Sequence, residues 1–150
     1  MKPVNDSRVI SASAQSVFLA VADIENLPQA RPHILSIEFL SDQKSGVGTR
    51  YRETRRKGKG TEQTELEVTE LVENEKVRLV SDAGGTIWDT TFAMSRLENQ
   101  VRLDVTMEIR PYNFLAKLFI PWFRGAVVKG VAFDLDCIKS HCERDRLTET

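Results

Sequence analysis

Long apolar runs are missing from this 150-residue sequence. Its first residues contain no apolar stretch of signal-peptide length. The most apolar segment, 114–123, is interrupted by Lys117 and Pro121 and is too short to span a bilayer. We therefore expect no stable membrane insertion and predict a cytoplasmic protein.

Cysteine is also scarce, with Cys137 and Cys142 the only two. Five residues apart on one helix, they would face different directions, so we expect reduced thiols rather than a disulfide. His141 can approach Cys137 at a spacing of four, but two ligands are too few for a closed zinc site. The Gly-x-Gly turns at 46–48 and 58–60 precede no helix and are not phosphate loops. We therefore expect no metal and no cofactor.

An excess of positive charge is absent too, since 21 Lys and Arg stand against 22 Asp and Glu. Proteins that bind duplex DNA are usually basic overall, so nucleic acid is not an expected partner. The basic run 50–59 is followed by four glutamates that can neutralise it across strands: Glu62, Glu65, Glu67 and Glu70.

Most of the chain is patterned for a folded core. A hydrophobic share of 41% with 29% charged residues excludes disorder, and the length suits one domain over residues 1–150. Ser13 is placed to cap a short helix, and a further helical turn is expected within 23–32. In the strand expected from Ile34, Leu35, Ile37 and Phe39 should face inward. Strands are predicted at 4–12, 34–39, 49–56, 61–72, 77–81, 86–97 and 101–110, with the clearest period-two alternation in the last.

The hairpin around Gly58-Lys59 can be given a register. Centred there, it places Arg50 opposite Glu67, Arg52 opposite Glu65, Arg55 opposite Glu62 and Tyr51 opposite Leu66. Three opposite-charge pairs and one aromatic–aliphatic pair then agree, each contributing roughly 0.2–1 kcal/mol.

The C-terminal region changes to a helical period. Six residues lie within a narrow arc at 100° per residue, and Pro121 should kink or divide the helix. Hairpin-linked strands with one long terminal helix predict an α+β fold: a curved antiparallel sheet of six to seven strands wrapped around the helix. The arc contains Ile120, Val127, Val131, Leu135, Ile138 and Cys142.

Short motifs spread over nearly the whole chain carry a family resemblance: Ile10-Ser11-Ala12-Ser13, Val17-Phe18, Asp23, Pro28, Pro32, Gly46–Tyr51, Pro111 and Leu135–Glu143. Their order resembles the superfamily of START-related lipid-transfer domains, pollen allergens and polyketide cyclases, nearest its bacterial polyketide cyclase/dehydrase-like branch. That resemblance implies a helix-grip fold with an apolar cavity. It implies no reaction, because the superfamily shares no single catalytic motif. Ala30 stands where this branch often has an aromatic residue, which would leave more room or a different entrance nearby.

The expected ligand-binding residues are those whose pattern points them toward the space between sheet and helix. Ordinary core packing explains any one of them, but together they mark a cavity wall. They are Tyr51, Leu66, Trp88, Thr90, Phe92, Leu103, Val105, Met107, Val127, Val131 and Asp134.

Asp134, Glu53 and Arg55 are the candidate catalytic residues. A desolvated carboxylate among them would have a raised pKa and could act as an acid or base. The alternative is a set of structural ion pairs, or of solvated charges at the cavity mouth. Gly125 and Gly130 in the long helix either open space for a ligand or permit close packing or a bend.

The aromatic segment Tyr112–Phe123 has more apolar surface than one buried helical face needs. It is interpreted as packing over the end of the sheet, as a mobile lid, as a homodimer or protein contact, or as a membrane-surface contact.

Three functions remain open. The leading one is binding of a small apolar or amphipathic molecule, such as a lipid, a quinone-like compound or an aromatic polyketide. The second is a cyclase- or dehydratase-type enzyme acting on such a molecule. The third is a protein-interaction domain.

Overall fold

The elements follow the predicted order in the computed structural model, which describes residues 2–148 and the side chains as far as Asp145. A single antiparallel sheet is ordered β1-β7-β6-β5-β4-β3-β2. The elements are β1 (Val4–Ile10), α1 (Ala14–Ala22), the 3-10 turn η1 (Ile24–Asn26), α2 (Leu27–Ala30), β2 (Ile34–Phe39), β3 (Arg50–Lys57), β4 (Gly60–Val72), β5 (Lys76–Ala83), β6 (Thr86–Arg96), β7 (Val101–Pro111) and α3 (Phe114–Thr148).

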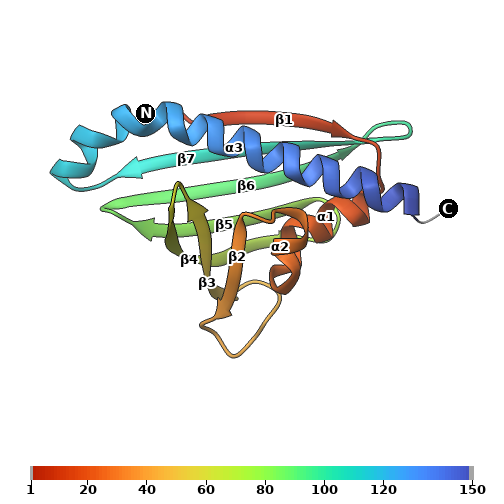
Figure 1. Cartoon of the computed structure of the whole chain (residues 1–150), viewed down its shortest axis with the longest axis horizontal. Coiled ribbons are helices and arrows are strands. Elements are labelled where there is room, and N and C mark those ends of the chain that lie inside the picture. Colours follow the sequence, from red (N-terminus) through yellow and green to blue (C-terminus); the bar gives the residue numbers. More distant parts are fainter. Residues whose placement is uncertain (1, 149–150) are drawn as a thin grey trace.

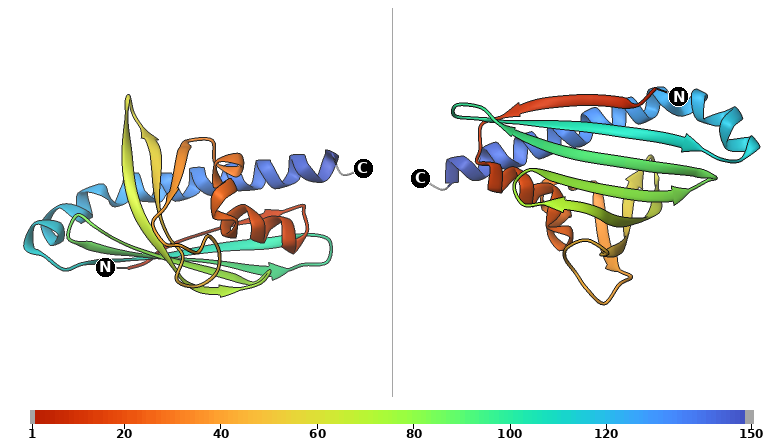
Figure 2. Two further views of the ribbon diagram at one scale, coloured as in Figure 1. Left: turned by 90° about the horizontal axis from the view of Figure 1, so that it is seen from below. Right: turned by 180° about the vertical axis from the view of Figure 1, so that it is seen from behind.

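The strands pair in chain order, and the curved sheet that they form has α3 on its concave side. Each strand from β2 to β6 pairs with its successor, and β1 pairs with β7 at the far edge. The long helix α3 runs across the concave side of the sheet, with α1 and α2 beside its second half (Figure 1). Figure 2 shows the β3–β4 hairpin rising past α3 as the sheet curls. The predicted α+β helix-grip architecture is confirmed.

The register predicted for the β3–β4 hairpin is confirmed at every pair: Arg50 faces Glu67, Tyr51 faces Leu66, Arg52 faces Glu65 and Arg55 faces Glu62. Arg52 makes its ion pair with Glu65 at 2.7 Å. Arg55 does not pair with Glu62, because its guanidinium turns inward while Glu62 binds Lys57 instead. The turn residue Gly58 has a φ of 58°, which a glycine adopts without strain.

Local signals position the short helices. The Ser13 hydroxyl accepts a hydrogen bond from the Ser16 amide and caps α1, as predicted. Pro28 in the first turn of α2 needs no helical hydrogen-bond partner there. Ala30 is fully buried at the end of α2, so its small side chain opens no entrance at the surface.

The burial pattern of β2 differs from the predicted one. Leu35 was expected to face inward, but it is exposed and Ile34 is buried. The cause is an irregularity in the β2–β3 pairing between Ile34 and Ser36, which shifts the alternation by one residue. Ile37 and Phe39 do pack on the core.

Helix α3 is continuous through Pro121 and bends in its first turns (Figure 1). Its predicted apolar face is buried at Ile120, Val131 and Leu135 and further along the helix, while Val127 is partly buried. It packs mainly on β1, β7, α1 and α2. Both cysteines are free thiols, as expected from their positions on this helix.

Candidate functional site

The face of the sheet toward α3, which we call the inner face, collects the predicted ligand-binding side chains. Cross-strand pairing places Trp88 beside Ile109 and Ser81, and Thr90 beside Met107 and Leu79. These residues come from consecutive hairpins whose alternation was readable in the sequence. The structure thus brings the predicted wall residues of β3 to β7 onto one surface.

Burial divides these residues into two groups. Five are buried and belong to the core: Tyr51, Phe92, Leu103, Val105 and Val131. Five predicted wall residues keep part of their surface in contact with solvent, although they are on the inner face or on the facing side of α3. This second group is Leu66, Trp88, Thr90, Met107 and Val127.

A charged cluster lies where α2, β2 and β3 meet α3. One carboxylate, that of Asp134, receives most of its contacts. Its Oδ1 lies 2.7 Å from Nε2 of His33, and its Oδ2 accepts from Arg55 Nη2 at 2.9 Å and from Arg31 Nη1 at 3.1 Å. Arg55 Nε donates to the buried carboxylate of Glu53 at 2.6 Å. Of the three predicted catalytic candidates, Arg55 therefore contacts both Asp134 and Glu53.

The direction of the Asp134 pKa opposes a role as acid or base near neutrality. Burial acts to raise this pKa, but the hydrogen bond with His33 and the charges of Arg31 and Arg55 outweigh it. The net result is a pKa far below the ordinary 3.8. The expectation that a desolvated carboxylate here would have a raised pKa is wrong for Asp134, because three donors converge on it.

Two members of the cluster, Arg31 and His33, were missed by sequence reasoning. They flank Pro32 after a four-residue helix, where no hydrophobic period shows which way a side chain points. The Arg31 Nε and the His33 Nδ1 are buried without a hydrogen-bond partner. The His33 ring also lies 4.9 Å from the ring of Phe133.

Tyr51 lies on the inner face below this cluster and is completely buried. Burial raises the pKa of its phenol, and the negative charge of Glu53 raises it further against the opposing charges of Arg31 and Arg55. Tyr51 is therefore a neutral hydroxyl group at any physiological pH.

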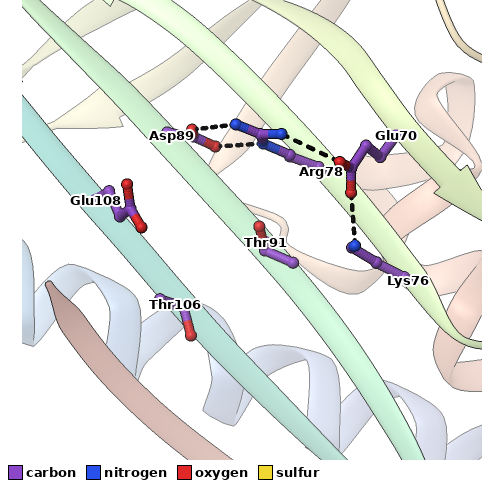
Figure 3. A pocket seen from close by; sticks show the side chains of 7 residues that line it. All are labelled: Glu70, Lys76, Arg78, Asp89, Thr91, Thr106 and Glu108. Carbon is purple, nitrogen blue, oxygen red and sulfur yellow. Dashed lines mark hydrogen bonds and ion pairs between the residues drawn. The ribbon is translucent and has the colours of Figure 1, made fainter.

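Two surface hollows lie away from the inner face. The first, of about 210 Å³, is on the opposite face of the sheet (Figure 3). There Arg78 binds the buried Asp89 with two nitrogens and also contacts Glu70, which in turn binds Lys76. Arg110 adds a further contact to Asp89. Cations and carboxylates neutralise one another here, as in a structural ion-pair network.

The second hollow, of about 520 Å³, lies between the start of α1 and the β6–β7 turn. It is bordered by the capping Ser13 and by turn residues 97–100, which are polar or exposed. The charged residues of its lining are Arg96 and Glu98, and both are exposed.

The two glycines of α3 do not line the inner face. Gly125 and Gly130 lie on the solvent side of α3, where an added methyl group would meet nothing, so they neither permit close packing nor open the inner face. Among residues 2–148, no three potential ligands gather as a metal-ion cluster. No described helix has both the length and the apolar character needed to cross a membrane.

Comparisons with known proteins agree with this architecture. A family model described as "Polyketide cyclase / dehydrase and lipid transport" matches residues 1–143. No curated protein matches the sequence.

Solved structures show the same fold at low identity. TTHA0849 from Thermus thermophilus is 17% identical with a TM-score of 0.74, over 93% of this chain and 96% of that one. A START superfamily protein from Mycobacterium smegmatis is 15% identical with a TM-score of 0.72, over 96% of this chain and 99% of that one. The di-domain ARO/CYC StfQ from the steffimycin pathway is 10% identical with a TM-score of 0.76, over 97% of this chain and 52% of that one.

Proposed function

This chain belongs to the polyketide cyclase/dehydrase and lipid transport family, and on that premise we propose that it binds one small apolar or amphipathic molecule between the sheet and α3. The candidate classes are a lipid, a quinone-like compound and an aromatic polyketide. The third class draws support from the similarity in fold to an ARO/CYC protein.

The observation that carries this proposal is the partial exposure of apolar side chains on the inner face. Leu66, Trp88, Met107 and Val127 pack against the core yet retain solvent contact. Helix α3 packs chiefly on β1 and β7 and on the short helices, so it does not seal these side chains. A ligand lying on them would remove apolar area from water, at about 25 cal/mol per Å². The hydroxyl of Thr90 adds a polar group that can orient it.

A titration with the neutral dye N-phenyl-1-naphthylamine tests the proposal. Thr90→Trp fills the inner face, and Trp122→Ser removes an exposed aromatic on the far side of α3 as a control. Saturable binding that weakens at least about tenfold in Thr90→Trp, with Trp122→Ser unchanged, is the expected result. Thermal unfolding by circular dichroism confirms that each variant is folded, and Met107→Trp provides a second filling variant.

Two outcomes would reject the inner-face site. One is dye binding that Trp122→Ser abolishes, since the dye would then occupy the helix surface. The other is binding that neither filling variant weakens.

A cyclase-type enzyme is the second candidate, favoured by the contact between His33 and Asp134. A carboxylate that stays ionised can orient an imidazole whose other nitrogen is free, as in general-base pairs. Once a bound compound is identified, its chromatographic retention and mass after incubation test this, because cyclisation alone conserves the mass and dehydration removes a water molecule. His33→Gln should abolish any change in retention or mass while leaving the affinity unchanged, and turnover that survives His33→Gln would exclude the pair as the catalytic base.

A further inference from the structure

The first turns of α3 have a large apolar surface on their solvent side. We define the aromatic patch as six residues that are all exposed: Phe114, Leu115, Leu118, Phe119, Trp122 and Phe123. Trp122 is 84% exposed and Phe114 is 78% exposed. Six large apolar side chains in ten residues far exceed the single exposed hydrophobics that are normal on a protein surface.

The aromatic patch is not the part of α3 that packs on the fold. Ala116 and Ile120, which are buried, lie at least about 120° from Phe114, Leu118 and Trp122 at 100° per residue. Phe123 lies closer to the buried side and is still exposed. In both views of Figure 2 the first turns of α3 lie at one end of the molecule, away from the short helices α1 and α2. Ala116 and Ile120 are therefore covered by the fold, whereas the patch residues do not pack on it.

The charges within the chain segment that contains the aromatic patch have one sign. Residues 111–133 contain three cations and no aspartate or glutamate. Of these cations, Lys117 and Lys129 are exposed. Arg124 donates to the carbonyl oxygens of Lys2 and Pro3, which holds the exposed Lys2 near the same helix. At the border, the carboxylate of Asp82 accepts a hydrogen bond from the Tyr112 hydroxyl.

We propose that the aromatic patch docks this protein reversibly on an anionic lipid surface. Aromatic and leucine side chains beside lysines are the composition of helices that lie in a membrane interface. Each lysine near such a surface adds attraction to anionic headgroups. A second copy of the chain is a poorer occupant, because it would bring Lys117 and Lys129 near like charges without a carboxylate in the segment to pair with them.

Co-sedimentation with vesicles tests this surface. The full chain is mixed with vesicles of equimolar phosphatidylcholine and phosphatidylglycerol, and in parallel with pure phosphatidylcholine. Phe119→Ser and Trp122→Ser each remove an exposed patch residue, and Leu97→Ser removes an exposed leucine in the β6–β7 turn as the matched control. We expect sedimentation with the anionic vesicles, about tenfold weaker binding in each patch variant, and no change in Leu97→Ser.

The charge contribution has its own variants. Lys117→Glu and Lys129→Glu should weaken binding to anionic vesicles, as should added salt, because both reduce the attraction to the headgroups. Brominated lipid should quench the fluorescence of Trp122, with Trp122→Phe reporting the remaining signal of Trp88. Equal binding to neutral vesicles, or absence of sedimentation, would overturn the proposal. Self-association that buries Trp122 without lipid would overturn it in favour of a second copy.

This docking surface stands apart from the inner face. Thr90→Trp, which fills the inner face, should leave vesicle binding intact, while the patch variants should leave dye binding intact. The vesicle experiment can therefore reject the docking proposal, and the dye experiment can reject the inner-face proposal, each independently.

Discussion

Nε2 of His33 and Oδ1 of Asp134 lie 2.7 Å apart, although 101 residues separate them in the chain. This contact joins the start of β2 to the second half of α3. Arg31 and Arg55 bind the same carboxylate, so one side chain connects four segments of the fold. The second half of α3 is thus fixed by a buried charge cluster, whereas its first turns are held by few buried residues.

Replacing Asp134 with asparagine should lower the free energy of unfolding by about 3 kcal/mol, because it leaves two arginines in the cluster without their shared anion. Asp136→Asn is the matched control on the same helix. Its carboxylate is 62% exposed, against 14% for Asp134, and pairs with Arg8. The control should cost under about 1 kcal/mol. Urea unfolding measures both, and equal losses would contradict the buried role of Asp134.

Acidification should remove the difference in unfolding free energy between the wild type and Asp134→Asn. The folded pKa of Asp134 is lowered from 3.8, so its contribution is complete above that value and is lost as pH falls toward the folded pKa. The gap in unfolding free energy should therefore be constant from pH 7 to about 5 and shrink below about 4. A gap that stays unchanged down to pH 3 would mean that the carboxylate is not held ionised by its neighbours.

Alanine at Gly125 or Gly130 should stabilise the protein by about 1 kcal/mol each, because glycine disfavours a helix and the new methyl group meets nothing. Gly85→Ala is the contrasting variant. There φ is 73° and the added methyl group would run into the side chain of Asn113, so stability should fall. Thermal unfolding ranks the three. Destabilisation by either helix variant would show that the glycine is required for a bend.

Cys142 should be alkylated much more slowly than Cys137, which is only partly buried although burial raises its pKa too. Burial, aided by the nearby charges of Asp145 and Glu143, raises the pKa of the Cys142 thiol to about 12, so almost no thiolate exists at pH 8. Iodoacetamide labelling followed by peptide mass analysis compares the two cysteines directly. Cys142 should become labelled only after unfolding in urea. Equal labelling rates in the folded protein would show that the end of α3 opens readily.

Much of the fold could be predicted from the sequence because its signals are local or periodic. The sequence positions of three oppositely charged residue pairs predicted the register of the β3–β4 hairpin, and the alternation in β7 separated its two faces. The inward position of Leu35 could not be predicted correctly, because the irregularity beside Ile34 depends on pairing with β3 and has no sequence period.

The site was less predictable than the fold. Asp134 was found from its angle on the helix, and Glu53 and Arg55 from strand alternation. Arg31 and His33 escaped because their positions depend on how a short turn meets α3. Whether the pKa of Asp134 is raised or lowered depends on how many donors converge on it, and these donors come from segments that meet only in the folded protein.

The inner-face proposal is tested most directly by native mass spectrometry of the purified protein after incubation with an organic extract of its expression host. Wild type and Trp122→Ser are compared with Thr90→Trp. The account predicts a one-to-one adduct of a lipid-like or aromatic compound in the first two and its loss in the third. Only the free protein mass in all three, or an adduct that survives Thr90→Trp and disappears in Trp122→Ser, would contradict it.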